Sequence, residues 1–268
     1  MRLALALTIC LTICAAPALG AEITPEALIG LRADVVILGE VHDNPAHHAH
    51  QAQAVAALAP AAIVFEMLTP EQAAAVTDAN RRDAAALEAA LGWQASGWPD
   101  FAMYHPIFTA APGARVYGAA LPGEDVRRAV REGAAAVFGA DAARFGLTAS
   151  LPPAEQAARE AEQMAAHCDA MPAALMPGMV EAQRLRDAAL ARATLRAMAE
   201  TGGPVAVITG SGHARRDWGV PAVLARAAPH LSVIAVGQVE AGAEAEQPFD
   251  YWIVTDPAPR PDPCAAFR

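Results

Sequence analysis

The chain has 268 residues, of which 19 are basic and 29 are acidic, so its formal net charge is −10. All of the basic residues are arginine. This balance argues against a nucleic-acid or anionic-membrane surface, because binding to phosphates needs a basic patch. Apolar residues make up 54% of the sequence, which excludes a mostly disordered chain. The length is sufficient for one large domain.

The first twenty residues have the pattern of a secretory signal peptide. Arg2 precedes an apolar stretch over 3–16, and Ala18 and Gly20 are the small residues expected before a cleavage site after residue 20. The stretch is shorter than the ~20 residues of a membrane-spanning helix. Both of its cysteines follow isoleucine, so there is no convincing lipid-attachment site. We therefore expect a mature chain over 21–268 that is periplasmic or secreted.

Six short apolar segments alternate with helical segments in the mature chain. The expected strands cover 34–39, 61–66, 115–120, 204–210, 231–236 and 250–254. The expected helices cover 45–58, 70–91, 123–138, 153–167, 176–200 and 220–228. Continuous apolar runs are typical of strands that are buried on both faces. The alternation predicts an α/β fold with a mainly parallel central sheet flanked by helices.

A long helical segment separates the third expected strand from the fourth. Residues 141–201 have no strand signal, and we interpret them as a helical insertion in a single domain over 21–268. The mature chain has two cysteines, Cys168 in this insertion and Cys264 near the C-terminus. An oxidising compartment favours a disulfide between them. The alternative is a pair of free thiols.

Polar side chains follow three of the expected strands at the point where each strand ends. Glu40 and His42 follow the first strand, Glu66 ends the second, and His213 follows the fourth. Ligand sites in open α/β sheets lie beyond the carboxyl ends of the strands. We therefore expect these four side chains to gather at one edge of the sheet. The alternative for the two histidines is a structural role at helix starts.

The helix expected at 45–58 begins with a clear signal. Asn44 is a typical N-cap residue, and Pro45 suits the first helical position. Histidines follow at positions 47, 48 and 50. Neighbouring histidines on an early helical turn are more often solvated than bound to a ligand. We therefore expect these three at the surface, with a metal cluster as the alternative.

These motifs and several others, in the same order along the chain, resemble the ChaN-type haem-binding uptake proteins of the Tiki superfamily. That superfamily shares two Gly-x-x-His motifs and a glutamate. The matching segments are 39–45 (GEVHDNP), 65–67 (FEM) and 210–214 (GSGHA). Further matching residues are Trp98, Tyr104, His167, Cys168, Gln183, Arg186, Asp187, Asp262, Pro263 and Cys264. The resemblance covers nearly all of the mature chain.

The resemblance implies haem as the cofactor and a role in iron uptake with envelope transport partners. It also implies a homodimer in which a second subunit completes the haem pocket. The cofactor-binding residues that we expect are Tyr104, His42, His213, Arg186 and Trp98.

Tyr104 is the first candidate for the iron ligand, because tyrosinate is a known ligand of haem iron. It lies in an aromatic segment that we expect to be a loop, and the alternative for it is a structural anchor of that loop. Arg186 or Arg215 would pair with the propionates.

A hydrolase related to the Tiki peptidases and erythromycin esterases is the alternative function. Glu40, His42, Glu66 and His213 would then be its catalytic residues. A divalent metal held by His42, His213 and Glu66 would activate water in one version of this hypothesis. Ser211 lacks the Gly-x-Ser-x-Gly frame of a nucleophile. Both functions need the same residues, so the sequence does not separate them.

Overall fold

The computed structural model describes residues 20–262 and 264–265, so the predicted signal peptide lies outside the described residues except for Gly20. In this part of the chain, seven parallel strands form one sheet in the order β1-β7-β6-β2-β5-β3-β4. The strands are β1 (Ala21–Glu22), β2 (Val35–Glu40), β3 (Ala62–Phe65), β4 (Arg115–Gly118), β5 (Val205–Gly210), β6 (Val233–Glu240) and β7 (Tyr251–Thr255). The predicted α/β fold is confirmed. Only the two-residue β1 is too short to have been recognised as an apolar run.

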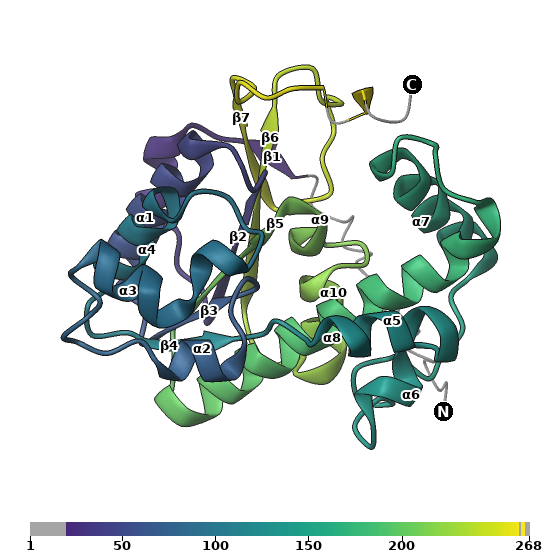
Figure 1. Cartoon of the computed structure of the whole chain (residues 1–268), viewed down its shortest axis with the longest axis horizontal. Helices are drawn as coiled ribbons and strands as arrows, with labels where there is room; N and C mark the ends of the chain where they lie inside the picture. Colours follow the sequence, from purple (N-terminus) through teal and green to yellow (C-terminus); the bar gives the residue numbers. More distant parts are fainter. Residues whose placement is uncertain (1–19, 263, 266–268) are drawn as a thin grey trace, which may run out of the picture.

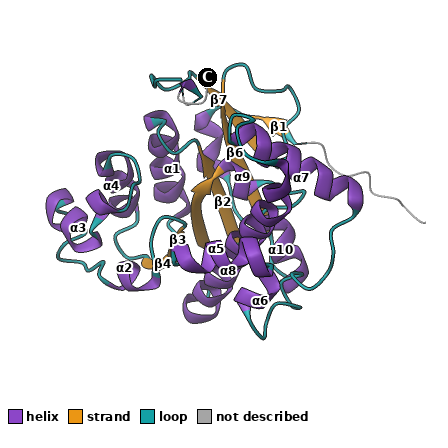
Figure 2. Cartoon of the chain, turned by 45° about the vertical axis from the view of Figure 1, so that its right-hand side comes forward, coloured by secondary structure: helices purple, strands orange, loops and turns teal. Residues whose placement is uncertain are grey.

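Helices cover both faces of this sheet (Figure 2). The α-helices are α1 (Pro45–Leu58), α2 (Pro70–Ala74), α3 (Ala84–Leu91), α4 (Phe101–Ala110), α5 (Gly123–Glu132), α6 (Ala134–Phe138), α7 (Pro153–Ala166), α8 (Met176–Thr201), α9 (Ser211–Ala214) and α10 (Val220–Ala227). Short 3-10 helices cover Pro25–Gly30, Trp93–Ala95 and Ala173–Leu175. In the described residues, no helix combines the length and the apolar character needed to cross a membrane.

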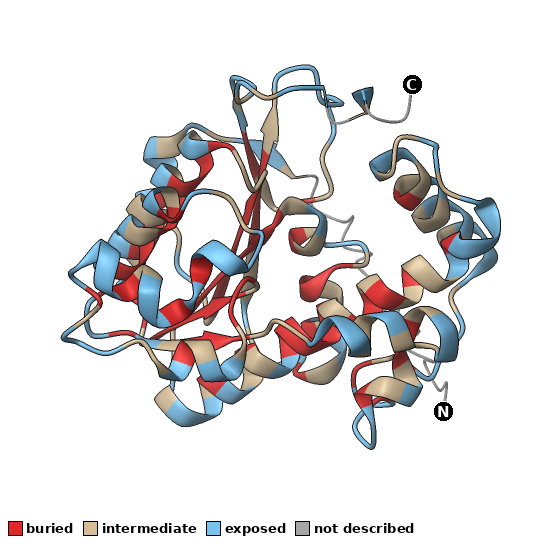
Figure 3. Cartoon of the chain, in the orientation of Figure 1, coloured by how far each residue is buried: buried red, intermediate tan, exposed pale blue. Residues whose placement is uncertain are grey.

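The alternation of side chains along each strand builds two hydrophobic cores. In β2, Val36 and Leu38 belong to the core shared with α1, α3 and α4. Val35 and Ile37 belong to the core shared with α5, α6, α8 and α10, because successive side chains of a strand point to opposite faces. The strands are accordingly buried along most of their length (Figure 3).

The structure corrects two of the expected helical segments and one expected loop. The segment 70–91 contains two helices, α2 and α3, and the segment 123–138 is divided at Gly133, whose φ is 87°. The aromatic segment around Tyr104, which we expected to be a loop, forms helix α4. Asp100 caps this helix by accepting a hydrogen bond from the Ala102 N–H at 2.9 Å. Apolar side chains at positions 101, 104, 107 and 108 give it one buried face.

The chain between β4 and β5 is helical and contains no strand in the residues that the structure describes. This helical segment begins at α5, earlier than the predicted boundary at residue 141. Helix α8 packs on the sheet, whereas α7 packs mainly on α8 and projects beside the strand ends (Figure 1).

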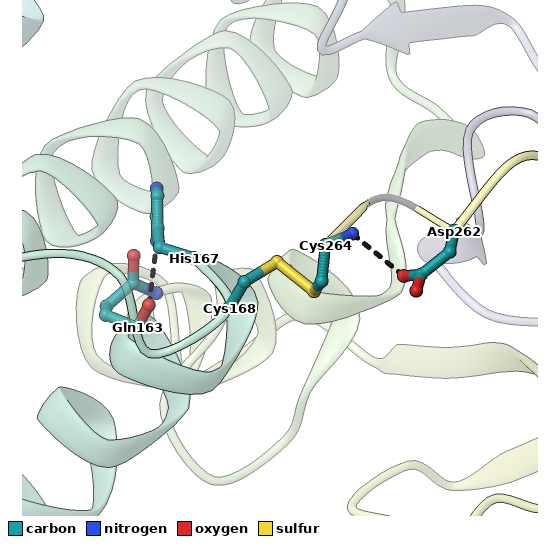
Figure 4. Close-up of a disulfide and its surroundings, with 5 residues drawn as sticks. All are labelled: Gln163, His167, Cys168, Asp262 and Cys264. Atoms are coloured by element: carbon teal, nitrogen blue, oxygen red, sulfur yellow. Dashed lines mark hydrogen bonds between the residues drawn. A yellow bond between two sulfur atoms is a disulfide. The ribbon is translucent and has the colours of Figure 1, made fainter. Parts of the chain in front are cut away.

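The predicted disulfide between Cys168 and Cys264 is confirmed, with a Cα–Cα distance of 5.5 Å (Figure 4). It joins the loop after α7 to the C-terminal tail after β7. A second contact holds the same tail, because the Arg260 guanidinium pairs with Asp43 at 2.7 Å and with Glu240 at 2.6 Å. The hydrogen bonds from Arg260 lower the pKa of the Glu240 carboxyl to about 2. The tail therefore connects α7 to the strand-end edge of the sheet.

Replacing Cys264 by serine should lower the free energy of unfolding by about 2–5 kcal/mol, because the disulfide closes a long loop in the unfolded chain. The two cysteines are 96 residues apart. Denaturant unfolding of the oxidised protein measures the loss. Cys168→Ser is the matched variant and should cost as much as Cys264→Ser. If the double variant loses the sum of the two single losses, the two residues do not act through one shared bond.

Candidate functional site

The structure brings the four predicted strand-end residues together at one edge of the sheet. Strands β2, β5 and β3 are neighbours and run in parallel, so their carboxyl ends meet. Glu40 is the last residue of β2, and His42 follows it two residues later. Glu66 follows β3, and His213 lies in α9 directly after β5. The side chains divide into two hydrogen-bonded networks.

Glu40 is the centre of the first network, and its side chain is fully buried. Its Oε1 atom accepts a hydrogen bond from the Tyr104 hydroxyl at 2.9 Å and lies 2.7 Å from Nδ1 of His42. Its Oε2 atom lies 3.4 Å from Nδ1 of His48. The contact with Glu40 engages Nδ1 of His42. In the described residues, Nε2 of His42 has no hydrogen-bond partner.

Tyr104 does not reach the surface. It is 0% exposed, and its ring packs against Trp93 and His48 at centroid distances of 4.8 and 4.1 Å. Burial and the nearby Glu40 carboxylate raise the pKa of Tyr104, so the phenol stays protonated. The prediction that Tyr104 lies on a loop is therefore wrong. Its hydroxyl serves as a donor to Glu40 inside the core.

His213 is the centre of the second network. Its Nδ1 atom lies 2.7 Å from Oδ1 of Asp187, which is carried by α8, and its Nε2 atom lies 3.5 Å from Oε1 of Glu66. Burial alone would lower the pKa of His213, but the two carboxylates outweigh this effect and raise it to about 9. His213 is therefore an imidazolium at neutral pH, held between two acidic side chains.

Glu66 is fixed from its other side. Its Oε2 atom accepts hydrogen bonds from the Thr209 hydroxyl at 2.6 Å and from the Gly210 N–H at 2.8 Å. Burial alone would raise the pKa of Glu66, but His213, His42 and these two donors outweigh this effect and lower it. A Cβ atom at Gly210 would lie 3.0 Å from Nε2 of His42. The absence of a side chain at this position lets the two networks approach each other.

A cleft of about 770 Å³ opens above these networks, between the strand ends and the helices that follow β4. The His42 side chain is 35% exposed in it, with its ring edge against Trp98 at a centroid distance of 4.9 Å. The cleft is also lined by apolar, amide and cationic side chains, among them Leu121, Val126, Gln183, Arg127 and Arg186. A smaller cavity of about 410 Å³ adjoins it and shares His42, Gln183 and His213.

The expected cofactor-binding residues therefore lie in different environments. His42, Trp98, Arg186 and His213 all line the cleft, but both ring nitrogens of His213 face carboxylates. Arg215, the other predicted propionate partner, pairs instead with Asp217 at 2.7 Å. Arg127 lines the cleft and was not predicted, because it lies in an ordinary charged helix with no motif around it.

The hypothesis of a metal held by His42, His213 and Glu66 receives no support from the geometry. Within the described ranges, no group of three or more histidine, cysteine, aspartate or glutamate side chains is arranged to hold a metal ion. His213 is instead hydrogen-bonded to Asp187, and Glu66 accepts hydrogen bonds from Thr209 and the Gly210 N–H.

The histidines of α1 are also not where we expected them. His47 and His48 are buried, although we expected both at the surface. Nδ1 of His47 accepts a hydrogen bond from the Val41 N–H at 2.8 Å, and its Nε2 lies 2.8 Å from the Thr255 hydroxyl. Burial lowers the pKa of His47 to about 4, so the ring is neutral. These residues join the start of α1 to the ends of β2 and β7. The predicted N-cap, Asn44, is confirmed.

Comparison with known proteins shows which family the sequence matches. Over residues 31–224, the sequence matches the family described as "Haem-binding uptake, Tiki superfamily, ChaN". The fold is similar to that of a solved structure entitled "Cofacial heme binding to ChaN of Campylobacter jejuni", with a TM-score of 0.63, 19% identity, and coverage of 85% of this chain and 91% of that chain.

The structure of the type III effector HopBA1 is also similar, with a TM-score of 0.50, 13% identity, and coverage of 87% of this chain and 93% of that chain. At these identities, the structural likeness shows a shared fold. No curated protein sequence matches the chain closely.

Replacing Asp187 by asparagine should lower the pKa of His213 from about 9 towards its ordinary value of 6.5, because one of the two carboxylates that stabilise the imidazolium is removed. An NMR titration of the His213 ring measures this change. Asp217→Asn is the matched control, since Asp217 pairs with Arg215 and should leave the pKa of His213 unchanged.

The same pKa sets a dependence of stability on pH. The pKa of His213 is higher in the folded protein than in an unfolded chain, so its stabilisation is complete below pH 6.5 and is lost as the pH rises through 9. The melting temperature of the wild type should therefore fall between pH 7 and pH 9 by more than that of Asp187→Asn. Equal slopes for the two proteins would contradict the assignment.

Proposed function

We propose that this chain, which belongs to the ChaN family of haem-binding uptake proteins in the Tiki superfamily, binds haem in the cleft at the strand ends, with His42 as the iron ligand. One observation carries the proposal. The cleft contains a partly exposed imidazole whose Nδ1 is held by Glu40 and whose Nε2 has no protein partner among the described residues. Imidazole is a common axial ligand of haem iron.

The residues of the cleft fit the chemistry of haem, which is an apolar disc with an iron centre and two anionic propionates. Trp98, Leu121 and Val126 supply apolar contacts, and Arg127 and Arg186 supply cations for carboxylates. The volume of about 770 Å³ lies within the usual range of ~300–1,000 Å³ for ligand pockets. Bound haem would supply an iron atom that accepts a nitrogen ligand. Binding haem in this way requires no chemical reaction by the protein.

Glu40 is the residue that would prepare His42 for this role. A carboxylate that accepts the Nδ1–H of a ligating histidine fixes the orientation of the ring and increases the basicity of Nε2. Tyr104 donates to the same carboxylate oxygen at 2.9 Å. It therefore helps to fix the Glu40 carboxylate that orients His42. This assignment replaces our expectation that Tyr104 itself binds the iron.

The hydrolase stays a second candidate because of one feature: His213 is hydrogen-bonded to Asp187 through Nδ1 and forms an ion pair with Glu66 through Nε2. Such an arrangement of acidic and basic groups can move a proton. The raised pKa of His213 makes it a proton donor at neutral pH. This candidate needs a substrate in the smaller cavity beside His213.

Export and assembly belong to the same proposal. The signal-like residues 1–20 and the disulfide support a periplasmic or secreted protein, since disulfides persist in oxidising compartments. We also propose that two subunits share the haem and that envelope transport partners deliver or receive it.

Titration of the purified protein with haemin should give a saturable shift of the Soret band at one haem per site. His42→Ala should abolish this shift or change its position, because the proposed iron ligand is lost. Tyr104→Phe should keep the wild-type spectrum, because the phenol donates to Glu40 and does not reach the cleft. His230→Ala is the matched control, as His230 is exposed and lies just before the start of β6, whereas the cleft lies at the carboxyl ends of the strands.

Two results would contradict the assignment. A changed spectrum for Tyr104→Phe with an unchanged one for His42→Ala would make Tyr104 the ligand. The absence of any Soret shift, together with hydrolysis of ester or peptide substrates that is lost in His213→Gln, would favour the hydrolase.

A further inference from the structure

Strand β4 lies at one edge of the sheet, and no strand of the described chain pairs with its outer side. It forms the floor of a cavity of about 580 Å³ that adjoins the proposed haem cleft and shares residues 119–121 with it. Helix α2 contacts β4 from one side and α8 contacts it from the other (Figure 1). Many of the lining residues are small, including Ala73 and Ala74 of α2 and Ala189 and Ala193 of α8. The sheet edge is therefore recessed but open.

The backbone of β4 directs unpaired groups into this cavity. The N–H of Arg115 donates to Ala61 at 3.0 Å, and the N–H of Ala119 donates to Phe65 at 3.0 Å. Both bonds lie on the β3 side. Since alternate residues of a strand direct their N–H and C=O groups to opposite edges, those of Val116 point away from β3. In the part of the chain that the structure describes, the Val116 N–H has no acceptor, and a partner strand would supply one.

The charge of the cavity is opposite to that of the protein. The charged side chains that line it are Arg81, Arg115, Arg192, Arg196 and Asp78. Arg115 and Arg196 share one counter-ion, Glu200, at 2.8 and 2.7 Å. Arg81 is buried and donates to three backbone carbonyls, so the cations available to a bound segment are Arg115, Arg192 and Arg196. They outnumber the nearby carboxylates of Asp78 and Glu200, whereas the whole chain has a formal charge of −10. An acidic segment would be attracted to this position.

We propose that β4 binds an extended, acidic segment of a partner protein as an additional strand of the sheet. Main-chain hydrogen bonds to Val116 would supply affinity, and the arginines would supply selectivity for acidic side chains. A second copy of this chain fits less well, because its own β4 is recessed between α2 and α8, and paired strands must approach to about 4.8 Å. Residues 119–121 line both this cavity and the haem cleft, so the bound segment would lie beside the proposed haem site.

Selection of octapeptides from a random phage-displayed library on the full-length protein tests this proposal. The enriched peptides should be rich in aspartate and glutamate, and these acidic residues should alternate with β-branched residues along the peptide. Synthetic copies should bind the wild type and Val116→Ala equally. They should bind Val116→Pro about tenfold more weakly or worse, because the proline lacks the N–H donor and leaves a carbonyl of the peptide unpaired.

Proline is tolerated in an edge strand where its nitrogen faces away from the neighbouring strand, so the sheet should persist in Val116→Pro. Circular dichroism and the haemin spectrum check its fold. If that variant does not fold, the double variant Arg115→Glu, Arg192→Glu replaces it. That variant keeps the backbone and should abolish binding of the acidic peptides through charge repulsion.

Three results would overturn the proposal. The first is enrichment of no peptide, or of peptides without an acidic bias. The second is equal binding of the enriched peptides to the wild type and to both the proline and the charge-reversed variants. The third is a dimer of the wild type in analytical ultracentrifugation that Val116→Pro abolishes, which would make a second copy of this chain the occupant of the cavity.

Discussion

The buried carboxylate of Glu40 is the constraint on which the site depends. A buried carboxylate is costly unless hydrogen-bond donors contact it, and here the two donors, which both contact Oε1, come from separate parts of the chain. Tyr104 reaches it from α4, and the Nδ1 atom of His42 lies 2.7 Å from it. The Glu40 side chain therefore couples the position of α4 in the core to the orientation of the partly exposed His42 ring.

The two Gly-x-x-His motifs place chemically identical side chains in different hydrogen-bonding situations, although for both rings nearby carboxylates outweigh burial and raise the pKa. His42 has one carboxylate behind its Nδ1 atom and faces the cleft with its other nitrogen. His213 lies between Asp187 and Glu66 and is locked as an imidazolium. The surroundings of each ring, more than the motif, decide whether it can bind a ligand. This difference is why we assign the iron to His42 and give His213 a structural and electrostatic role.

Local sequence signals were sufficient for six of the seven strands of the described chain, because runs such as 34–39 and 204–210 are mostly apolar, whereas β1 is too short to give such a signal. They also placed Glu40, His42, Glu66 and His213 at one sheet edge, which follows from parallel strands alone. The burial of Tyr104 was not predictable, since it depends on α4 packing against α1 and on the contact of Tyr104 with Glu40, and Pro106 inside α4 obscures the helix in the sequence. Arg127 and the open edge of β4 depend on tertiary arrangement, for which the sequence carries no local signal.

The most direct test of the account is a crystal structure of the full chain with bound haemin. We expect the porphyrin in the strand-end cleft with its iron bonded to Nε2 of His42. We also expect the Tyr104 hydroxyl to be still hydrogen-bonded to Glu40. An iron atom bonded to the oxygen of Tyr104, or a porphyrin bound outside this cleft, would contradict the account.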